Sequence, residues 1–268
     1  MNFQLALSLV VLLIFGQFQV RARFHSWLQR IVDGSDLHCG APYVATLEVE
    51  KANGIEHCIG TLINLTHVIT AAHCLDNGES VRVTLGNGAS KEFGVSIRTK
   101  KWHIHPGFYI SSKKYNDIAV IILQSPLDLN KCIQPVTLPD IHELKNLSNC
   151  ITFDQNVKET SKELIPKQTS LLKNKCFEFV GKDQRLCEEF WATDSPNSCK
   201  EPMGSPLICL KNKNSQQVLV GFASAAGCYK GFTVYVNVAF HQKWLNLFSN
   251  ELKEHQSIPS KISNILAQ

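Results

Sequence analysis

The chain contains the stretch Ser198-Cys199-Lys200-Glu201-Pro202-Met203-Gly204-Ser205-Pro206-Leu207-Ile208-Cys209, its most informative segment. Two cysteines ten residues apart frame this stretch, and Met203 at its centre precedes a glycine and a Pro-Leu pair. The thioether of Met203 has no proton to lose, so it cannot be activated as a nucleophile. Any chemistry at this centre must therefore do without a nucleophilic side chain at position 203.

Two other segments carry residue types that work together in nucleophilic catalysis. One is Thr70-Ala71-Ala72-His73-Cys74, with Cys58 sixteen residues before Cys74. The other is Asn116-Asp117-Ile118-Ala119-Val120-Ile121, with His105-Pro106 ahead of it. Together the three segments resemble the histidine, aspartate and nucleophile segments of the chymotrypsin-like (S1 family) serine proteases. The resemblance covers about residues 31–250.

The resemblance implies an all-β, trypsin-like fold of two antiparallel six-stranded Greek-key barrels with a C-terminal helix. Short β-branched or alternating runs between Gly, Asn and Asp turns agree with an all-β chain. We expect strands of the first barrel near 43–50, 58–64, 67–71, 81–86, 94–99 and 117–123. Those of the second are expected near 150–153, 176–180, 206–210, 217–223 and 233–238, after a polar connector at 124–149.

Apolar residues near the end of the chain recur at helical spacing, which predicts a helix docking one face on the body. These residues are Phe240, Trp244, Leu247, Phe248 and Leu252.

The chain begins with an apolar run from Leu5 to Phe15, which predicts a secretory signal peptide over residues 1–22. A short propeptide over 23–30 would follow, and the resemblance implies cleavage after Arg30 to free Ile31. We expect the trypsin-like domain over 31–253 and a tail over 254–268. No later stretch approaches about 18 uninterrupted apolar residues, so no membrane span is expected in the mature protein.

Ten cysteines behind a signal peptide indicate an oxidising compartment, and sequons at Asn64 and Asn146 are typical of a secreted glycoprotein. The formal net charge is +4, but residues 1–30 hold three arginines and no acidic residue. The mature chain therefore has 24 basic and 23 acidic residues. This near-neutral balance argues against a nucleic-acid binder driven by bulk charge.

The resemblance implies four disulfides: Cys58–Cys74, Cys150–Cys209, Cys176–Cys187 and Cys199–Cys228. Cys39 and Cys132 remain, and we pair them by elimination. Each bridge stabilises a loop-rich barrel by roughly 2–4 kcal/mol. The scaffold of the family is thus expected to be intact.

The catalytic positions implied by the resemblance are partly lost. His73 and Asp117 remain as a histidine and its orienting acid, while Met203 stands at the nucleophile position. Glu201 replaces the glycine whose amide faces the oxyanion, and Pro202 replaces the aspartate that pairs with the new amino terminus. Since proline has neither a carboxylate nor an amide hydrogen, cleavage after Arg30 would not switch on a site in the usual way.

The substrate pocket implied by the resemblance is altered as well. Asn197 takes a position that is acidic in trypsin-like members, and Ala226 and Thr233 take positions of pocket glycines. Their methyl and hydroxyl groups are expected to narrow the pocket. The family's Ser-Trp-Gly wall reads Ser224-Ala225-Ala226.

Other interpretations of single residues stay open at the level of sequence. Ser205 could serve as a nucleophile only in a register that breaks the cysteine and Pro-Leu matches. His103 and His105 are only two apart and favour surface histidines over a metal site, so we expect neither metal nor cofactor. A lysine-rich run suits either a solvated face or contact with an acidic partner; it contains Lys158, Lys162, Lys167, Lys173 and Lys175.

The sequence thus predicts a secreted, catalytically inactive serine protease homologue that acts by binding proteins. It is similar in style to the scabies mite inactivated protease paralogues, which also have a single protease domain with substitutions around the triad. That similarity implies serum complement components as partners. The alternatives are an unorthodox or weakly active secreted serine endopeptidase, and a decoy that binds protease inhibitors.

Overall fold

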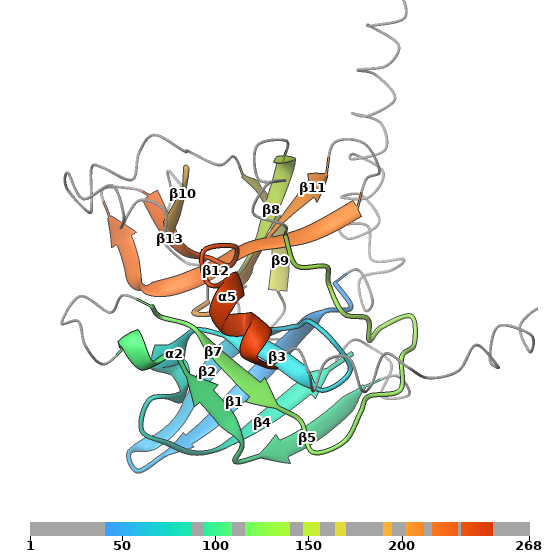
Figure 1. Ribbon diagram of the computed structural model, residues 1–268, viewed down its shortest axis with the longest axis vertical. Coiled ribbons are helices and arrows are strands. Elements are labelled where there is room, and N and C mark those ends of the chain that lie inside the picture. Colours follow the sequence, from blue (N-terminus) through green and yellow to red (C-terminus); the bar gives the residue numbers. More distant parts are fainter. Residues whose placement is uncertain are drawn as a thin grey trace, which may run out of the picture.

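A computed structural model describes residues 41–86, 94–108, 116–139, 147–155, 164–169, 190–194, 202–211, 216–229 and 232–248. These residues form two antiparallel sheets, one above the other, with one short C-terminal helix beside them (Figure 1). The expectation of an all-β, trypsin-like fold is confirmed.

The first sheet has the strand order β5-β4-β1-β2-β3-β7-β6. Its strands are β1 (Val44–Lys51), β2 (Gly54–Leu62), β3 (His67–Thr70), β4 (Gly78–Leu85), β5 (Val95–Thr99), β6 (Trp102–Ile104) and β7 (Ala119–Ile122). Side chains along a strand point alternately to the two faces of the sheet, and one face covers the core. Along β1, Ala45, Leu47 and Val49 are buried while their neighbours are half-buried.

This sheet counts seven strands where six were expected, because one barrel strand is interrupted. β5 and β6 lie at opposite edges of the sheet, yet only Lys100 and Lys101 separate them in the chain. The sheet must therefore curl until its two edges meet. At this seam the amide of Ile122 donates to the carbonyl of Lys101 at 2.9 Å, and the hydroxyl of Thr99 donates to the carbonyl of Ile122 at 2.9 Å.

The second sheet has the order β10-β13-β12-β11-β8-β9. Its strands are β8 (Leu147–Gln155), β9 (Leu164–Thr169), β10 (Phe190–Asp194), β11 (Pro206–Lys211), β12 (Gln216–Tyr229) and β13 (Phe232–Asn237). Sequence patterning missed β6, β9 and β10. β9 contains Pro166, and proline is tolerated there because β9 is an edge strand of the described sheet. The strand expected near 176–180 lies outside the described residues.

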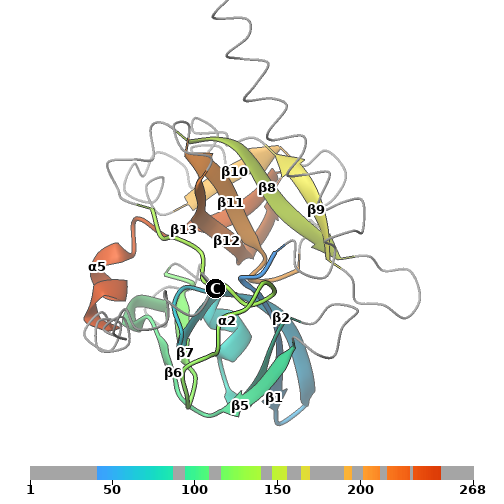
Figure 2. The ribbon, with the colours of Figure 1, turned by 90° about the vertical axis from the view of Figure 1, so that its right-hand side faces the viewer.

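The C-terminal segment crosses back from the second sheet to the first (Figures 1 and 2). One α-helical turn, α5 (Gln242–Leu245), continues into a 3₁₀ turn, η3 (Asn246–Phe248). Trp244 and Phe248 pack against the core as expected, but Leu247 is 73% exposed and Leu245 is buried in its place. The tighter 3₁₀ turn rotates Leu247 away from the face that a regular helix would present. Leu252 lies outside the described residues.

Two further short helices lie in the connections between strands of the first sheet. α2 (Ala72–Leu75) follows β3, and η1 (Pro106–Phe108) follows β6. Among the described residues, no helix is long and apolar enough to cross a membrane.

Candidate functional site

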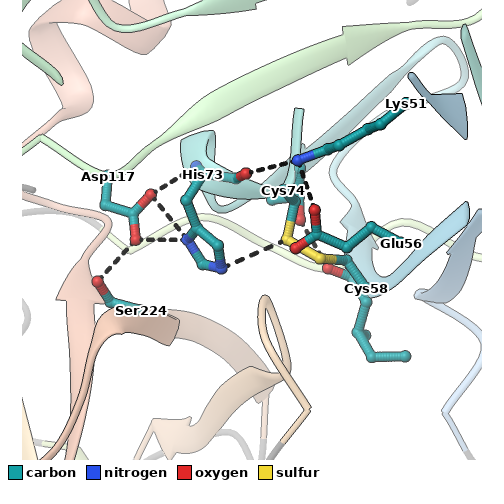
Figure 3. Close-up of a disulfide and its surroundings, with 9 residues drawn as sticks. Lys51, Glu56, Cys58, His73, Cys74, Asp117 and Ser224 are labelled. Carbon is teal, nitrogen blue, oxygen red and sulfur yellow. Dashed lines mark hydrogen bonds and ion pairs between the residues drawn. A yellow bond between two sulfur atoms is a disulfide. The ribbon is translucent and has the colours of Figure 1, made fainter. Parts of the chain in front are cut away.

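His73 lies on α2, and contacts with β1 and β2 hold this single helical turn in place. Its neighbour Cys74 is bridged to Cys58 on β2, with the two Cα atoms 6.3 Å apart. The ammonium of Lys51 donates to the His73 carbonyl oxygen at 3.3 Å and also forms an ion pair with Glu56 (Figure 3). A helix of four residues is too short to be stable alone, so this framework fixes the backbone of His73.

Asp117 is fully buried just before β7 and accepts hydrogen bonds on both carboxylate oxygens. Oδ1 accepts from the backbone amide of His73 at 2.9 Å, and Oδ2 lies 2.9 Å from ring Nδ1. The hydroxyl of Ser224 on β12 donates to Oδ2 at 2.8 Å (Figure 3). A buried carboxylate is tolerated when donors surround it in this way.

Asn116, the residue before this aspartate, has an uncommon backbone conformation. Asn116 has φ of 55°, a left-handed conformation that asparagine adopts more readily than most residues. The sequence order Asn-Asp thus has a local conformational basis.

Met203 occupies a turn just before β11, with 39% of its surface exposed. Its carbonyl accepts from the amide of Ile59 at 2.8 Å, and the amide of Gly204 donates to the carbonyl of Ala223 at 2.9 Å. Ile59 directly follows Cys58, whose disulfide partner Cys74 is next to His73. Ala223 directly precedes Ser224, which donates to Asp117. The structure therefore brings Met203 beside the His73–Asp117 pair.

Gly204 is required by this packing. Its φ is +80°, and a Cβ at this position would overlap the carbonyl oxygen of Ile59. Thr70 donates to the same carbonyl oxygen at 2.7 Å, which leaves no room for it to retreat. The turn at Met203 is thus locked between the two sheets.

Ser205 faces inward. It is fully buried, and its hydroxyl donates to the carbonyl of Phe153 on β8 at 3.0 Å. Its own amide donates to the carbonyl of Pro202 at 2.9 Å. A hydroxyl engaged in this way serves the packing of β11 on β8 rather than a solvent-facing reaction.

The remaining expected site residues are only partly described. Thr233 is buried on β13 and pairs with Cys228 and with Thr193 in the ladder. Ala226 lies within β12, but its side chain is outside the described set. Glu201, Asn197, Arg30, Ile31 and Asn146 lie outside the described residues.

Two of the expected disulfides are formed: Cys58–Cys74 and Cys150–Cys209. Cys132 is also disulfide-bonded, while the expected partner Cys39 is not described. The pairs Cys176–Cys187 and Cys199–Cys228 involve residues outside the described set.

Sequence reasoning missed the layer of histidines behind Asp117. The ring of His241 lies 5.4 Å from that of His105, and the ring of His105 lies 5.1 Å from that of Trp244 on α5. Burial, reinforced by the nearby His105, lowers the pKa of His241 to about 3, although the charge of Asp117 acts in the opposite direction. Burial also lowers the pKa of His105. His105 and Trp244 were noted in the sequence, but only the fold brings them onto His241.

One group of metal-binding residue types occurs among the described residues. The sulfurs of Cys58 and Cys74 and a ring nitrogen of His73 lie within 4.8 Å of one another. Both sulfurs belong to a disulfide, so they offer no thiolate to an ion. His103 stacks on Phe248, with ring centroids 5.1 Å apart.

A buried aspartate, a histidine oriented by it and a turn wedged between two β-sheets define the framework of a serine-protease-like protein. Comparison with known proteins agrees: the Trypsin family profile matches residues 31–245. The chain belongs to the trypsin family. It is 28% identical over 219 residues to a chymotrypsin from Phaedon cochleariae, covering 78% of each chain. It is also 26% identical over 244 residues to vitamin K-dependent protein C from Rattus norvegicus, spanning 83% of this chain and about half (52%) of that protein.

Proposed function

We propose that this chain is a secreted, catalytically inactive trypsin-family protein that acts by binding other proteins. The observation that carries this proposal is Met203, which takes the position that the resemblance assigns to the nucleophile and whose turn is held by neighbours of the contacts of His73 and Asp117. A thioether cannot transfer a proton to His73 and cannot form an acyl-enzyme ester. Peptide bond cleavage by the usual route of the family is therefore closed.

The neighbours of Met203 support the same conclusion. Pro202 carries no carboxylate for a new amino terminus, and Glu201 brings a negative side chain to the position of an oxyanion-binding glycine. Stabilisation of the oxyanion supplies about 3–4 kcal/mol of transition-state binding per donor in acyl-transfer enzymes. Because the nucleophile and these two supporting groups are lost together, restoring one of them would not restore efficient peptide hydrolysis.

The scaffold, by contrast, is retained. Cys58–Cys74 and Cys150–Cys209 are formed. Asp117 accepts hydrogen bonds from the backbone amide and ring Nδ1 of His73 and from the hydroxyl of Ser224. A rigid barrel pair that displays variable loops is a suitable platform for protein recognition. We propose serum complement components as the partners, by analogy with the inactive paralogues that the sequence resembles.

The lysine-rich run over 158–175 is one segment of the sequence that suits contact with an acidic partner. Lys167 lies half-buried on β9, at an edge of the second sheet. Clustered lysines favour an acidic protein surface and give an association rate that falls with salt.

The proposal is tested by immobilising the folded mature protein, exposing it to serum and identifying the retained proteins by mass spectrometry. A trypsin-like protease whose active site has been blocked by an inhibitor is the control for nonspecific binding that is common to the fold. A second arm uses a variant in which the five lysines of the run are changed to glutamine. Recovery of complement proteins by the chain alone, reduced in the lysine variant, supports the proposal; equal recovery by the control contradicts it.

A weakly active endopeptidase is the second candidate, favoured by the intact His73–Asp117–Ser224 arrangement. The buried hydroxyl of Ser205 opposes it, because that group donates to Phe153. Labelling by a fluorophosphonate probe that disappears in Ser205→Ala would favour this second function.

A further inference from the structure

We propose that His73 is itself a nucleophile toward activated acyl esters, such as aryl esters, and that the chain hydrolyses them slowly. This activity goes beyond the proposed binding function and does not require a hydroxyl at position 203. It follows from the hydrogen bonding of a single imidazole ring.

The ring of His73 is held in one tautomer. Because the carboxylate of Asp117 only accepts hydrogen bonds, the proton between them must reside on Nδ1, which lies 2.9 Å from Oδ2. Nε2 of the neutral ring then carries a lone pair. The backbone amide of His73 donates to the same carboxylate at 2.9 Å, so the ring and the main chain are oriented by one group.

Nε2 accepts no hydrogen bond from a nitrogen or oxygen donor among the described residues. Its polar contact among the described residues is with Sγ of Cys74 at 3.7 Å. That sulfur is part of the disulfide with Cys58, so it has no proton to donate to Nε2. The His73 side chain is 11% exposed, whereas Asp117 is not exposed at all. We propose that a small planar ester approaches the exposed part of the ring, while Asp117 behind it stays buried.

The adjacent turn contains one amide that can serve as a donor for the developing oxyanion. The amides of Gly204 and Ser205 are both used in hydrogen bonds within the fold. The amide of Met203 makes no hydrogen bond in the described part of the chain, since only its carbonyl is engaged, by Ile59. This free N–H belongs to the turn that lies beside the His73–Asp117 pair, where it can bind a negative oxygen.

The reaction balances without any further group. Nε2 attacks the ester carbonyl carbon, the C–O bond to the aryl group breaks, and the bonding pair leaves on the phenolate. The resulting acylimidazolium keeps its Nδ1 proton directed at Asp117. Water then attacks the acyl carbon, the C–N bond breaks, and its pair returns to Nε2. The proton lost by water ends on the phenolate or in solvent, so the products are a carboxylic acid and a phenol.

The chemistry also sets the substrate class. A phenolate leaves without being protonated, but an amide nitrogen must be protonated in order to leave. His73 cannot supply that proton, because it has taken none from a hydroxyl nucleophile. Peptides are therefore excluded, and the activity is compatible with an inactive protease.

The test is hydrolysis of p-nitrophenyl acetate by the full folded chain, compared with His73→Gln and with His57→Gln. His57 is exposed on β2 and is a matched control for the background from surface imidazoles. We expect His73→Gln to lose at least about tenfold of the rate above buffer, within the usual contribution of a positioned imidazole. His57→Gln should keep that rate. The wild type alone should show the transient ultraviolet absorbance of an N-acylimidazole.

Asp117 and Ser224 act as positioning residues, and Ser224→Ala tests them by removing the hydroxyl that donates to Oδ2 of Asp117. This variant should slow hydrolysis and weaken the acylimidazole signal while leaving the near-ultraviolet circular dichroism unchanged. Equal rates for the wild type and His73→Gln, or a rate abolished by a fluorophosphonate, would overturn the proposal. Cleavage of peptides would contradict the proposed binding function instead.

Discussion

Asp117 binds His73 twice, through the backbone amide at 2.9 Å and through ring Nδ1 at 2.9 Å. The carboxylate thus fixes both the position of α2 and the tautomer of the imidazole. Such an arrangement has a structural use even in the absence of a nucleophile, because a fully buried carboxylate without donors would be costly. The survival of His73 and Asp117 beside Met203 is consistent with that structural use.

Met203→Ser alone is expected to leave peptide hydrolysis undetectable. The new hydroxyl would lie beside His73. Glu201 and Pro202 would still occupy the positions that the resemblance assigns to the oxyanion glycine and to the aspartate that anchors the amino terminus. The measurement is hydrolysis of chromogenic peptide substrates before and after proteolytic cleavage of the chain after Arg30. Inhibitor-sensitive cleavage by this single variant would show that the damage is confined to one side chain.

Gly204→Ala is expected to destabilise the fold by at least about 2 kcal/mol, because positive φ and close packing both oppose a side chain. Gly54→Ala is the matched control: its φ is also positive, at 132°, but nothing lies within 4 Å of the added Cβ. Urea denaturation of both variants checks the difference. Equal losses of unfolding free energy would mean that contact with Ile59 contributes nothing.

Acid should destabilise the protein through His241. Its folded-state pKa is about 3, below the usual 6.5, because burial and then His105 disfavour the charged form. The stabilisation is fully present above pH 6.5 and is lost as the pH falls toward 3. At pH 5 the loss is about 2 kcal/mol, from 1.36 kcal/mol per pH unit.

His241→Phe should remove this part of the pH dependence, since phenylalanine has no charge to gain. The measurement is the unfolding free energy at pH 7 and pH 5 for both proteins, where the difference between them isolates His241. An identical loss in the variant would assign the acid sensitivity to other groups.

The structure argues against a glycan on Asn64, one of the two expected sequon sites. Its Oδ1 accepts from the amide of Thr66 at 2.7 Å, while Nδ2, the atom that would carry the sugar, is buried without a hydrogen-bond partner among the described residues. Mass spectrometry of tryptic glycopeptides should find Asn64 unmodified in the folded protein. A glycan there would require this turn to open.

Ser205→Ala is expected to cost about 1 kcal/mol through the lost hydrogen bond to Phe153. It should not change reactivity toward fluorophosphonates, because the hydroxyl is buried. Thermal unfolding measures the first expectation and labelling measures the second. Loss of labelling in this variant would instead make Ser205 a reactive group.

Much of the fold was predictable because its signals are local. Alternating residues along β1 and the apolar run of β7 mark strands, and three short segments identified the family. β9 was missed since Pro166 reads as a strand breaker, and only its place at a sheet edge makes it acceptable. The break at Lys100–Lys101 was missed because closure of a barrel has no signature in the neighbouring residues.

The sequence by itself determined the family, the two barrels and the absence of a nucleophilic side chain at position 203, because these depend on residue identity and short spacing. Only the tertiary structure decided the roles of Ser224, Ser205 and His241. Their partners Asp117, Phe153 and His105 are 52 to 136 residues away in sequence. Hydrogen bonding and burial depend on distances in space rather than along the chain. Only folding determines which residues distant in sequence come together in the protein interior.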